Sequence, residues 1–241
     1  MRLDLTWRPE DDLELPMAVW HPGSGYRMIS TGVLGGGLGP REWVLNAQVP
    51  AAYARTDPGA HLRKLAAGLG LGGPGVGLLT AAQVAGLVQR EVEGVHAAAT
   101  VGLRVPTWAA APPGHRDPDL APAAPPGRGG PHPAPGDGKV PGTINVVVAV
   151  PVPLTDAAFV NAVVTATEAK VQAVLDAGFP GTGTATDAIC VAAPDTDPDG
   201  APGEDFAGPR SVWGARIARA VHAAVRAGAD GYAATLNGRV P

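Results

Sequence analysis

Residues 181–189, GTGTATDAI, place three threonine hydroxyls and one carboxylate, that of Asp187, between two glycines and an apolar run. Glycines let a backbone turn tightly, hydroxyls donate or accept hydrogen bonds, and a carboxylate can take a proton from water. With backbone N–H groups to stabilise an oxyanion, these are the components of a site that hydrolyses an amide without a metal. A polar turn that starts a strand would have the same composition, so both interpretations stay open at this point.

Two further polar sets could border a cleft. In the helix predicted after Asp156, four polar residues share a narrow angular band: Asn161, Thr165, Glu168 and Gln172. The band is either a solvated flank or a cleft wall, where Glu168 could act as acid or base and Asn161 could hold an amide. In GTINVVV, residues 142–148, Thr143 and Asn145 lie on the same face of the predicted strand and could also border the cleft.

The C-terminal half predicts the order β-α-β-α that would position these residues. Its elements are a buried strand at 143–150, a helix within 153–178, a strand at 187–193 and a helix at 211–227. Thr155 can cap the first helix, and Gly178 can end it in a left-handed turn. The predicted inner stripe of the first helix is Val160, Val163, Val164, Thr167, Val171, Val174 and Leu175. That of the last helix is Ile217, Ala220, Val221, Ala224 and Val225.

The N-terminal half also mixes strands with helices. The pattern predicts a hairpin of strands at 17–21 and 26–33, strands at 42–49, 75–81 and 95–103, and helices at 60–71 and 82–92. We therefore expect an α/β or α+β fold, in which helices pack on a mixed β-sheet.

Residues 111–140 interrupt this pattern, because half of these thirty residues are Pro or Gly and few are large and apolar. Such a segment cannot offset its ordering entropy by burial. The runs at 95–103 and 143–150 on either side are strand-like and could pair. We interpret 1–241 as one domain with a flexible insertion at about 111–140, and a linker between two domains is the alternative.

The glycine run TGVLGGGLGP, residues 31–40, lacks the pattern of a nucleotide-binding loop. A dinucleotide fingerprint counted from Gly35 would need glycine where Pro40 stands, and no Lys-Ser/Thr pair follows. The run is either a turn between strands or a flexible backbone, at Gly36 and Gly37, that offers N–H groups to a bulky ligand.

Composition excludes several classes of protein. The chain has 18 basic and 22 acidic residues, a net charge of −4, and no basic cluster, which argues against nucleic acid as a partner. No apolar stretch reaches the length of a membrane span, and the acidic start is unlike a signal peptide, so we expect a cytoplasmic protein without membrane contact. The sequence makes no prediction of oligomeric state.

Metal and thiol chemistry have little support. The acidic loop from Asp195 begins like a calcium loop, but its twelfth position is Phe206. The six histidines show no i, i+4 pair and no zinc-protease motif. The single cysteine, Cys190, lies in an apolar strand, where an inert buried thiol is the expected state. We predict no metal and no cofactor.

In chain order, the motifs resemble the adenosylcobinamide amidohydrolase family of corrinoid salvage. They are STGVLGGG, VLNAQVP, GLLTAA, ATVGL, GTINVVV, LTDAAFVNAVVTATEAK, GTGTATDAI and FAGP. The resemblance spans roughly residues 24–105 and 141–228, and GTIN, TEAK and T-x-T-D are its most specific parts. The residues that it carries over are Gly142, Thr143, Asn145, Glu168, Lys170, Thr184, Thr186 and Asp187.

The resemblance implies hydrolysis of the amide that links aminopropanol to the corrin ring of adenosylcobinamide, giving adenosylcobyric acid, with the corrinoid as substrate. We assign the catalytic steps to Asp187, Glu168 and Thr186. Asp187 or Glu168 would activate a water molecule. The other carboxyl group, or Lys170, would transfer the proton that the leaving amine needs. A hydroxyl nucleophile, Thr186 or Thr184, is the alternative. The residues assigned to substrate binding are Thr184, Thr143, Asn145, Asn161, Asn46, Gly36 and Gly37.

Two other functions stay open. A non-catalytic corrinoid-binding or trafficking protein would bind the substrate without releasing aminopropanol. A hydrolase of another amide would bind cobinamide no more tightly than a generic amide.

Overall fold

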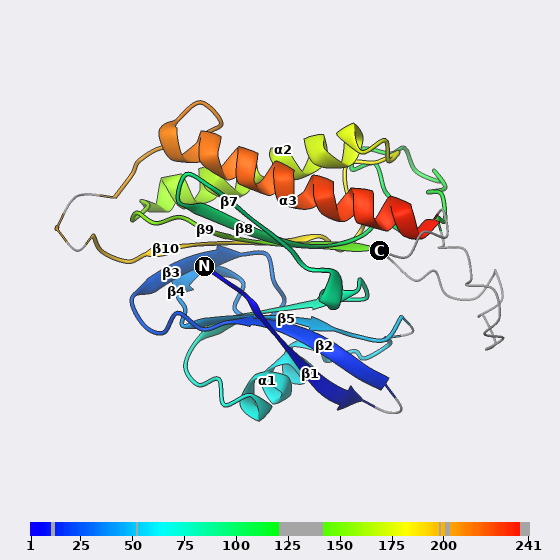
Figure 1. The fold of residues 1–241 in the computed structure, drawn as a ribbon, viewed down its shortest axis with the longest axis horizontal. Coiled ribbons are helices and arrows are strands. Elements are labelled where there is room, and N and C mark those ends of the chain that lie inside the picture. The colour runs from blue at the N-terminus through cyan, green and yellow to red at the C-terminus, as the bar shows by residue number, and fades with distance from the viewer. Residues whose placement is uncertain (11–12, 52, 121–141, 198, 201–202, 237–241) are drawn as a thin grey trace.

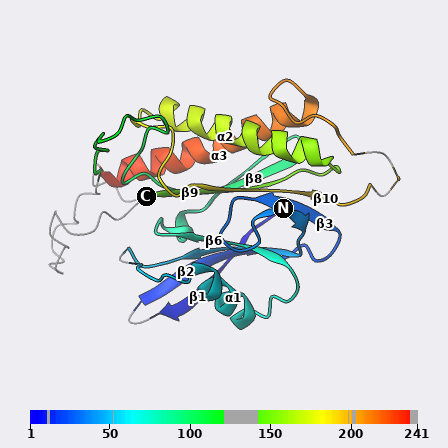
Figure 2. The ribbon, with the colours of Figure 1, turned by 180° about the vertical axis from the view of Figure 1, so that it is seen from behind.

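The computed structural model describes residues 1–10, 13–51, 53–120, 142–197, 199–200 and 203–236. The chain forms four layers, with two helices on one outer face, two stacked sheets in the middle and one helix on the other outer face (Figure 1). The view from behind shows the same stacking (Figure 2). The predicted class, helices packed on mixed β-structure, is confirmed, and the strands divide between two sheets.

The larger sheet has the strand order β4-β3-β10-β9-β8-β7. Its strands are β3 (Tyr26–Ser30), β4 (Gly37–Pro40), β7 (Val88–Val92), β8 (Val95–Gly102), β9 (Thr143–Ala149) and β10 (Ala188–Pro194). β9 and β10 are parallel, and the other neighbours are antiparallel. Because β9 and β10 start at the same edge of the sheet, the segments that enter these two strands lie close together there.

The smaller sheet has the order β1-β2-β5-β6. Its strands are β1 (Asp4–Glu10), β2 (Leu13–Trp20), β5 (Trp43–Gln48) and β6 (Gly75–Thr80). The parallel strands β5 and β6 are joined through α1 (Pro58–Gly68), which covers the outer face of this sheet. An apolar cluster that includes Met28, Val44 and Val147 fills the space between the two sheets.

Helices α2 (Asp156–Asp176) and α3 (Val212–Leu236) pack against each other and cover the larger sheet. The Thr155 side chain accepts a hydrogen bond from the Ala158 N–H, and Gly178 has φ +82°, so both predicted ends of α2 are confirmed. All five residues of the predicted α3 stripe are fully buried. Across the described residues, no helix combines the length and apolar character needed to span a bilayer.

The predicted inner stripe of α2 is largely wrong. Val160, Val164 and Leu175 are 56%, 48% and 42% exposed. The buried face is built mainly of alanine, together with Phe159, Val174, Thr165 and Lys170. Small side chains let the helix approach the sheet and α3 closely, so five of its alanines face inward, whereas Val160 and Val164 face solvent.

Two predictions in the N-terminal half are also wrong. Residues 82–92, predicted as a helix, form a short 3₁₀ helix, η1 (Val84–Gly86), followed by β7, which pairs with β8. The predicted hairpin partners are β2 and β3, but these strands belong to different sheets. β1 and β4, which the pattern did not indicate, provide antiparallel neighbours for β2 and β3 respectively.

The strands predicted to pair across the Pro/Gly-rich insertion do so, because β8 and β9 are antiparallel neighbours. Most of the insertion, residues 121–140, lies outside the described residues, and its predicted flexibility stays a prediction. The single-domain interpretation likewise stays a prediction.

Candidate active site

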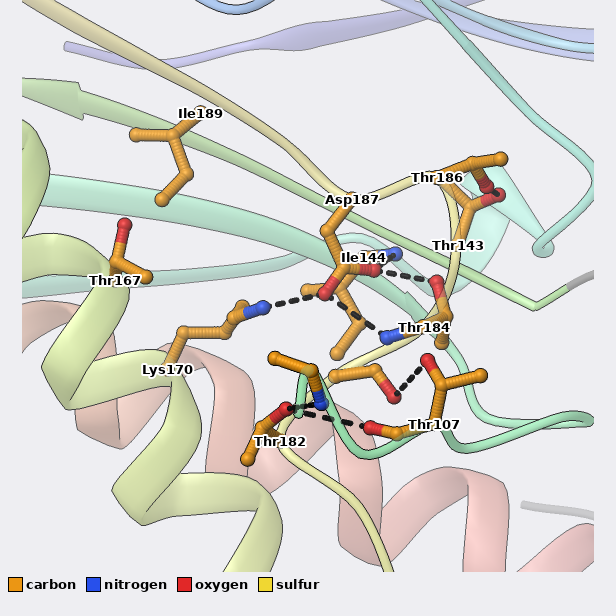
Figure 3. A network of polar contacts seen from close by, with 12 residues as sticks. Thr107, Thr143, Ile144, Thr167, Lys170, Thr182, Thr184, Thr186, Asp187 and Ile189 are labelled. Atoms are coloured by element: carbon orange, nitrogen blue, oxygen red, sulfur yellow. Dashed lines mark hydrogen bonds and ion pairs between the residues drawn. The ribbon is translucent and has the colours of Figure 1, made fainter. Parts of the chain in front are cut away.

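The Asp187 side chain is the centre of a polar cluster at the edge where β9 and β10 begin. Its Oδ1 accepts hydrogen bonds from the Ile144 N–H at 2.9 Å and the Thr184 hydroxyl at 2.5 Å. Its Oδ2 accepts from the Lys170 ammonium at 2.5 Å and the Thr184 N–H at 3.1 Å. Figure 3 shows these four donors converging on the carboxylate from a strand, a helix and a loop. All its usual acceptor positions are therefore occupied.

The ion pair of Lys170 with Asp187 is shielded from water, since the two side chains are only 9% and 11% exposed. Lys170 lies on the buried face of α2, and Asp187 directly precedes β10. Charges in such surroundings need a partner and further hydrogen bonds, which the Thr184 and Ile144 donors supply to the carboxylate. The arrangement fixes the carboxylate, and the Thr184 hydroxyl is its one neutral side-chain donor.

Gly183 makes room for this ion pair, and sequence reasoning missed it. A Cβ atom at this position would lie 2.2 Å from Asp187 Oδ2 and 2.4 Å from Lys170 Nζ, where ordinary contact begins at 3.4 Å. Any residue other than glycine would displace both charged groups. The signal was present in GTGT, where glycine lies directly before a threonine that contacts the acid.

The loop that carries Thr184 is held in place by the chain that follows β8. The Thr107 N–H donates to the Gly183 carbonyl at 2.9 Å, and the Thr182 N–H donates to the Thr107 carbonyl at 2.8 Å. These bonds form an isolated antiparallel bridge between two distant segments. Backbone pairing of this kind holds the site loop more firmly than surface side-chain contacts would.

Thr186 and Thr143 form a second group of hydroxyls beside the carboxylate. Their Oγ1 atoms are 2.8 Å apart, and the Thr186 hydroxyl donates to the Gly142 carbonyl at 3.1 Å. Thr143 is buried, whereas Thr186 is exposed. Thr186 is therefore the member of this pair that reaches the surface, and contact of either residue with a ligand stays a prediction.

The sequence candidates Asn46 and Asn145 meet between the two sheets. Asn145 Nδ2 donates to Asn46 Oδ1 at 2.9 Å and to the Leu79 carbonyl at 3.0 Å, and Asn46 Nδ2 donates to Thr100 Oγ1 at 3.0 Å. Both asparagines are 1% exposed. In this arrangement their amides join the sheets beneath the edge that carries Thr143, and neither is open to solvent.

Two candidates on α2 lie outside the cluster. Asn161 accepts a hydrogen bond from the Ala207 N–H at 3.1 Å, so it holds the FAGP segment, residues 206–209, against the helix. It is nine residues before Lys170, about 13 Å along a helix. Glu168 is exposed, and residues two apart on a helix do not face each other, so it points away from the side that carries Lys170.

The glycine run lies at the same edge of the larger sheet as Asp187. It follows β3, where the Thr31 hydroxyl accepts from the Ile189 N–H and the Thr31 N–H donates to the Ile189 carbonyl, both at 3.0 Å. Gly37 has φ +81°, which favours glycine where the chain turns into β4. A Cβ atom on Gly36 would lie 2.6 Å from the Gly32 carbonyl oxygen. The close approach of this backbone explains both glycines structurally, and their contact with a ligand stays a prediction.

A pocket of about 540 Å³ adjoins the cluster through Gly142. It lies between the C-terminal half of α3, the connection from β6 to β7, and the end of β8. The ring of Tyr232 is part of its wall, while the hydroxyl donates to the Leu120 carbonyl at 2.8 Å. Burial raises the pKa of Tyr232 to about 12, so this hydroxyl stays protonated at neutral pH.

The other candidate chemistries gain no support from the geometry. Cys190 is fully buried, and burial raises the pKa of its thiol to about 12, as expected for an inert cysteine. Within the described ranges, no three His, Cys, Asp or Glu residues are grouped closely enough to hold a metal ion.

Comparisons with known proteins agree with the sequence motifs. The family model described as adenosylcobinamide amidohydrolase matches residues 4–236. A curated protein of Methanosarcina mazei, named adenosylcobinamide amidohydrolase, is 28% identical over 210 residues, which are 85% of this chain and 90% of that protein. Both matches include the β9, α2 and β10 elements that surround Asp187, because they cover nearly the whole chain.

Proposed function

This chain belongs to the adenosylcobinamide amidohydrolase family, and we propose that the family's reaction takes place at the Asp187 cluster. The reaction hydrolyses the amide between aminopropanol and the corrin ring of adenosylcobinamide, and it releases adenosylcobyric acid and aminopropanol for cobamide salvage. The observation that supports this location is the hydrogen bond from the Thr184 hydroxyl to a carboxylate that a buried lysine holds in place.

In this proposal Thr184 supplies the nucleophile. A hydroxyl becomes nucleophilic when an adjacent base takes its proton and a third group orients that base. Thr184, Asp187 and Lys170 stand in this relation. Of the four donors on Asp187, the Thr184 hydroxyl is the one that ordinarily acts in acyl transfer, whereas the two backbone N–H groups only bind the carboxylate.

The proposed steps balance as follows. The Thr184 oxygen attacks the amide carbonyl carbon while Asp187 takes the hydroxyl proton. Asp187 then gives this proton to the amide nitrogen as the C–N bond breaks, so that aminopropanol leaves as a neutral amine and the corrinoid acyl group stays on Thr184 as an ester. Water attacks the ester, its proton returns through Asp187 to the Thr184 oxygen, and adenosylcobyric acid is released.

The developing oxyanion needs donors that the resting site does not already use. The Thr184 N–H is occupied by Asp187, so we assign this role to the N–H groups of Ala185 and Thr186, which follow in the same exposed turn. The Thr186 hydroxyl then contacts the substrate amide. Direct attack by a water molecule, with Asp187 as its base, is the alternative route through the same groups.

The test is incubation of the purified protein with adenosylcobinamide and mass spectrometry of the products. Wild-type protein releases aminopropanol and adenosylcobyric acid, whereas Asp187→Asn and Thr184→Val release neither at a comparable rate. A corrinoid that binds without release of aminopropanol would indicate a binding or trafficking protein. Cobinamide that binds no more tightly than a simple amide would indicate a hydrolase with another substrate.

The two routes differ in whether a covalent intermediate forms. Rapid acid quenching followed by intact-protein mass spectrometry detects a corrinoid ester on the wild-type chain if Thr184 is the nucleophile. Peptide mapping then places the ester on residues 181–189. An unmodified chain throughout turnover, with activity retained in Thr184→Val, would support attack by water.

A further inference from the structure

We propose that the pocket beside Gly142 holds the edge of the corrin macrocycle from which the scissile amide extends. This inference rests on the proposed function, because it concerns the same substrate and the same site. It assigns a binding role to the C-terminal end of α3, which contains none of the motifs, and to the connection between β6 and β7, of which the GLLTAA motif covers only Ala81 and Ala82.

The first argument is position. Gly142 lines the pocket, and its carbonyl accepts the hydrogen bond from Thr186. Gly102, which also lines the pocket, is the sheet partner of Thr143. The scissile amide of a cobinamide is joined to its ring by a short alkyl chain, so the ring edge must lie directly beside the groups that cleave the amide.

The second argument is the chemistry of the walls. Three wall residues on α3, Ala227, Gly228 and Gly231, have little or no side chain, and Gly86 stands on the opposing connection. Walls without projecting side chains leave flat apolar surfaces, which suit the face of a large planar ring. The polar side chains at the lining, Gln83 and Arg104 among them, are suited to the amides on the rim of a corrinoid.

The third argument is size. A volume of about 540 Å³ falls within the range of small-molecule sites. A corrin macrocycle with its side chains is larger than this volume, so the pocket can enclose one edge of the ring and leave the rest outside. The pocket thus selects the orientation that brings the tail amide to Thr184 and Thr186.

Gly231 allows a direct test, because a Cβ atom at this position meets nothing within 4 Å. Gly231→Leu therefore adds a side chain to the pocket wall without a clash at its Cβ atom, and leucine favours a helix more than glycine does. Gly68→Leu is the matched control, since Gly68 lies in α1 on the opposite outer layer and is equally free of neighbours. Gly86→Leu fills the pocket from the other wall and serves if Gly231→Leu does not fold.

The probes are adenosylcobyric acid and cobyric acid without the adenosyl ligand, which contain no scissile amide. Binding is measured by equilibrium dialysis and the visible absorbance of the corrinoid. We expect Gly231→Leu to bind both probes about tenfold more weakly than wild type, because ligand and side chain compete for the same volume. Gly68→Leu binds both probes as wild type does, and Gly231→Ala shows a smaller loss.

Three results would overturn the proposal. Equal binding by wild type and both filled variants would place the ring elsewhere. Weaker binding of the adenosyl probe alone would assign the pocket to the adenosyl group. Failure of the wild type to bind either probe would remove the corrinoid from this pocket. If wild type binds and Gly231→Leu does not, but no aminopropanol is released from adenosylcobinamide, then the pocket proposal stands and the proposed hydrolysis fails.

Discussion

Replacement of Gly183 by alanine should disable the site while leaving the fold intact. The new Cβ atom would stand 2.2 Å from Asp187 Oδ2 and 2.4 Å from Lys170 Nζ. Ordinary contact begins at 3.4 Å, so each charged atom must retreat by roughly 1 Å. Asp187 cannot move that far and keep its bonds to Ile144 and Thr184, and a Lys170 that swings away leaves the carboxylate without its cation.

The size of the effect follows from this displacement. A misplacement of about 1 Å in a catalytic group costs on the order of 10²-fold in rate, which corresponds to about 2.7 kcal/mol in the activation barrier. The overpacking should reduce stability by about 1–3 kcal/mol, and for a chain of this size the melting temperature falls by about 2–4 °C per kcal/mol. We therefore expect Gly183→Ala to be folded at 25 °C and to lose about 99% of its kcat/KM.

The assay is aminopropanol release from adenosylcobinamide over a range of substrate concentrations, with circular dichroism and thermal melting on the same preparations. Gly68→Ala is the control, because its added methyl group meets no protein atom within 4 Å. A folded Gly183→Ala enzyme with kcat/KM within about threefold of wild type would refute the reasoning, because catalysis would then not depend on the exact position of the ion pair.

Three further predictions concern single side chains. Lys170→Met leaves the Asp187 carboxylate buried without its cation, and we expect a loss of about 3 kcal/mol in the free energy of unfolding measured with urea; a variant as stable as wild type would contradict this. Glu168→Gln should keep kcat within about twofold of wild type, because the exposed Glu168 side chain lies away from the cluster. A large loss of kcat would show that Glu168 takes part in catalysis. Cys190 should resist iodoacetamide at pH 8 in the native protein and react fully after denaturation, because burial raises the pKa of its thiol to about 12; modification without unfolding would show that the strand opens.

The C-terminal half was predictable because local and global signals agree there. β9 is buried along its whole length and consists mostly of branched apolar residues, so it shows the continuous pattern of a central strand. Thr155 and Gly178 mark the ends of α2 through their own conformational preferences. The order β9-α2-β10-α3 follows from these signals without tertiary information.

The N-terminal errors come from tertiary pairing. The apolar residues of 82–92 recur at helical spacing, but β8 offers an edge to which Val88–Val92 can pair, and this pairing overrides the local pattern. β2 and β3 are close in sequence and alternate as hairpin strands do. In the structure β2 pairs with β1 and β3 pairs with β4, both antiparallel, and the local sequence pattern indicated neither β1 nor β4.

The contacts among the site residues could not be predicted from the sequence, for a related reason. Motif order placed Thr184 and Asp187 in one loop, but it could not distinguish Lys170 from Glu168, two charged residues in the same TEAK motif. The distinction depends on which face of α2 is buried, and the assumption that valine faces inward gave the wrong face. Had the alanine face been recognised as the packing face, Lys170 would have been the one charged side chain on it.

A lysine among buried alanines is a strong signal in its own right. An ammonium group in such surroundings needs a negative partner, because no other interaction offsets the free energy of removing it from water. In the C-terminal half, the acid nearest the shared edge of β9 and β10 is Asp187, and the glycine at 183 is the feature that lets the two groups meet. Three features of the sequence therefore act together: the small residues on the inner face of α2, the glycine in the loop and the acid before β10. Close packing of the helix brings the Lys170 ammonium to the Asp187 carboxylate, which binds the Thr184 hydroxyl.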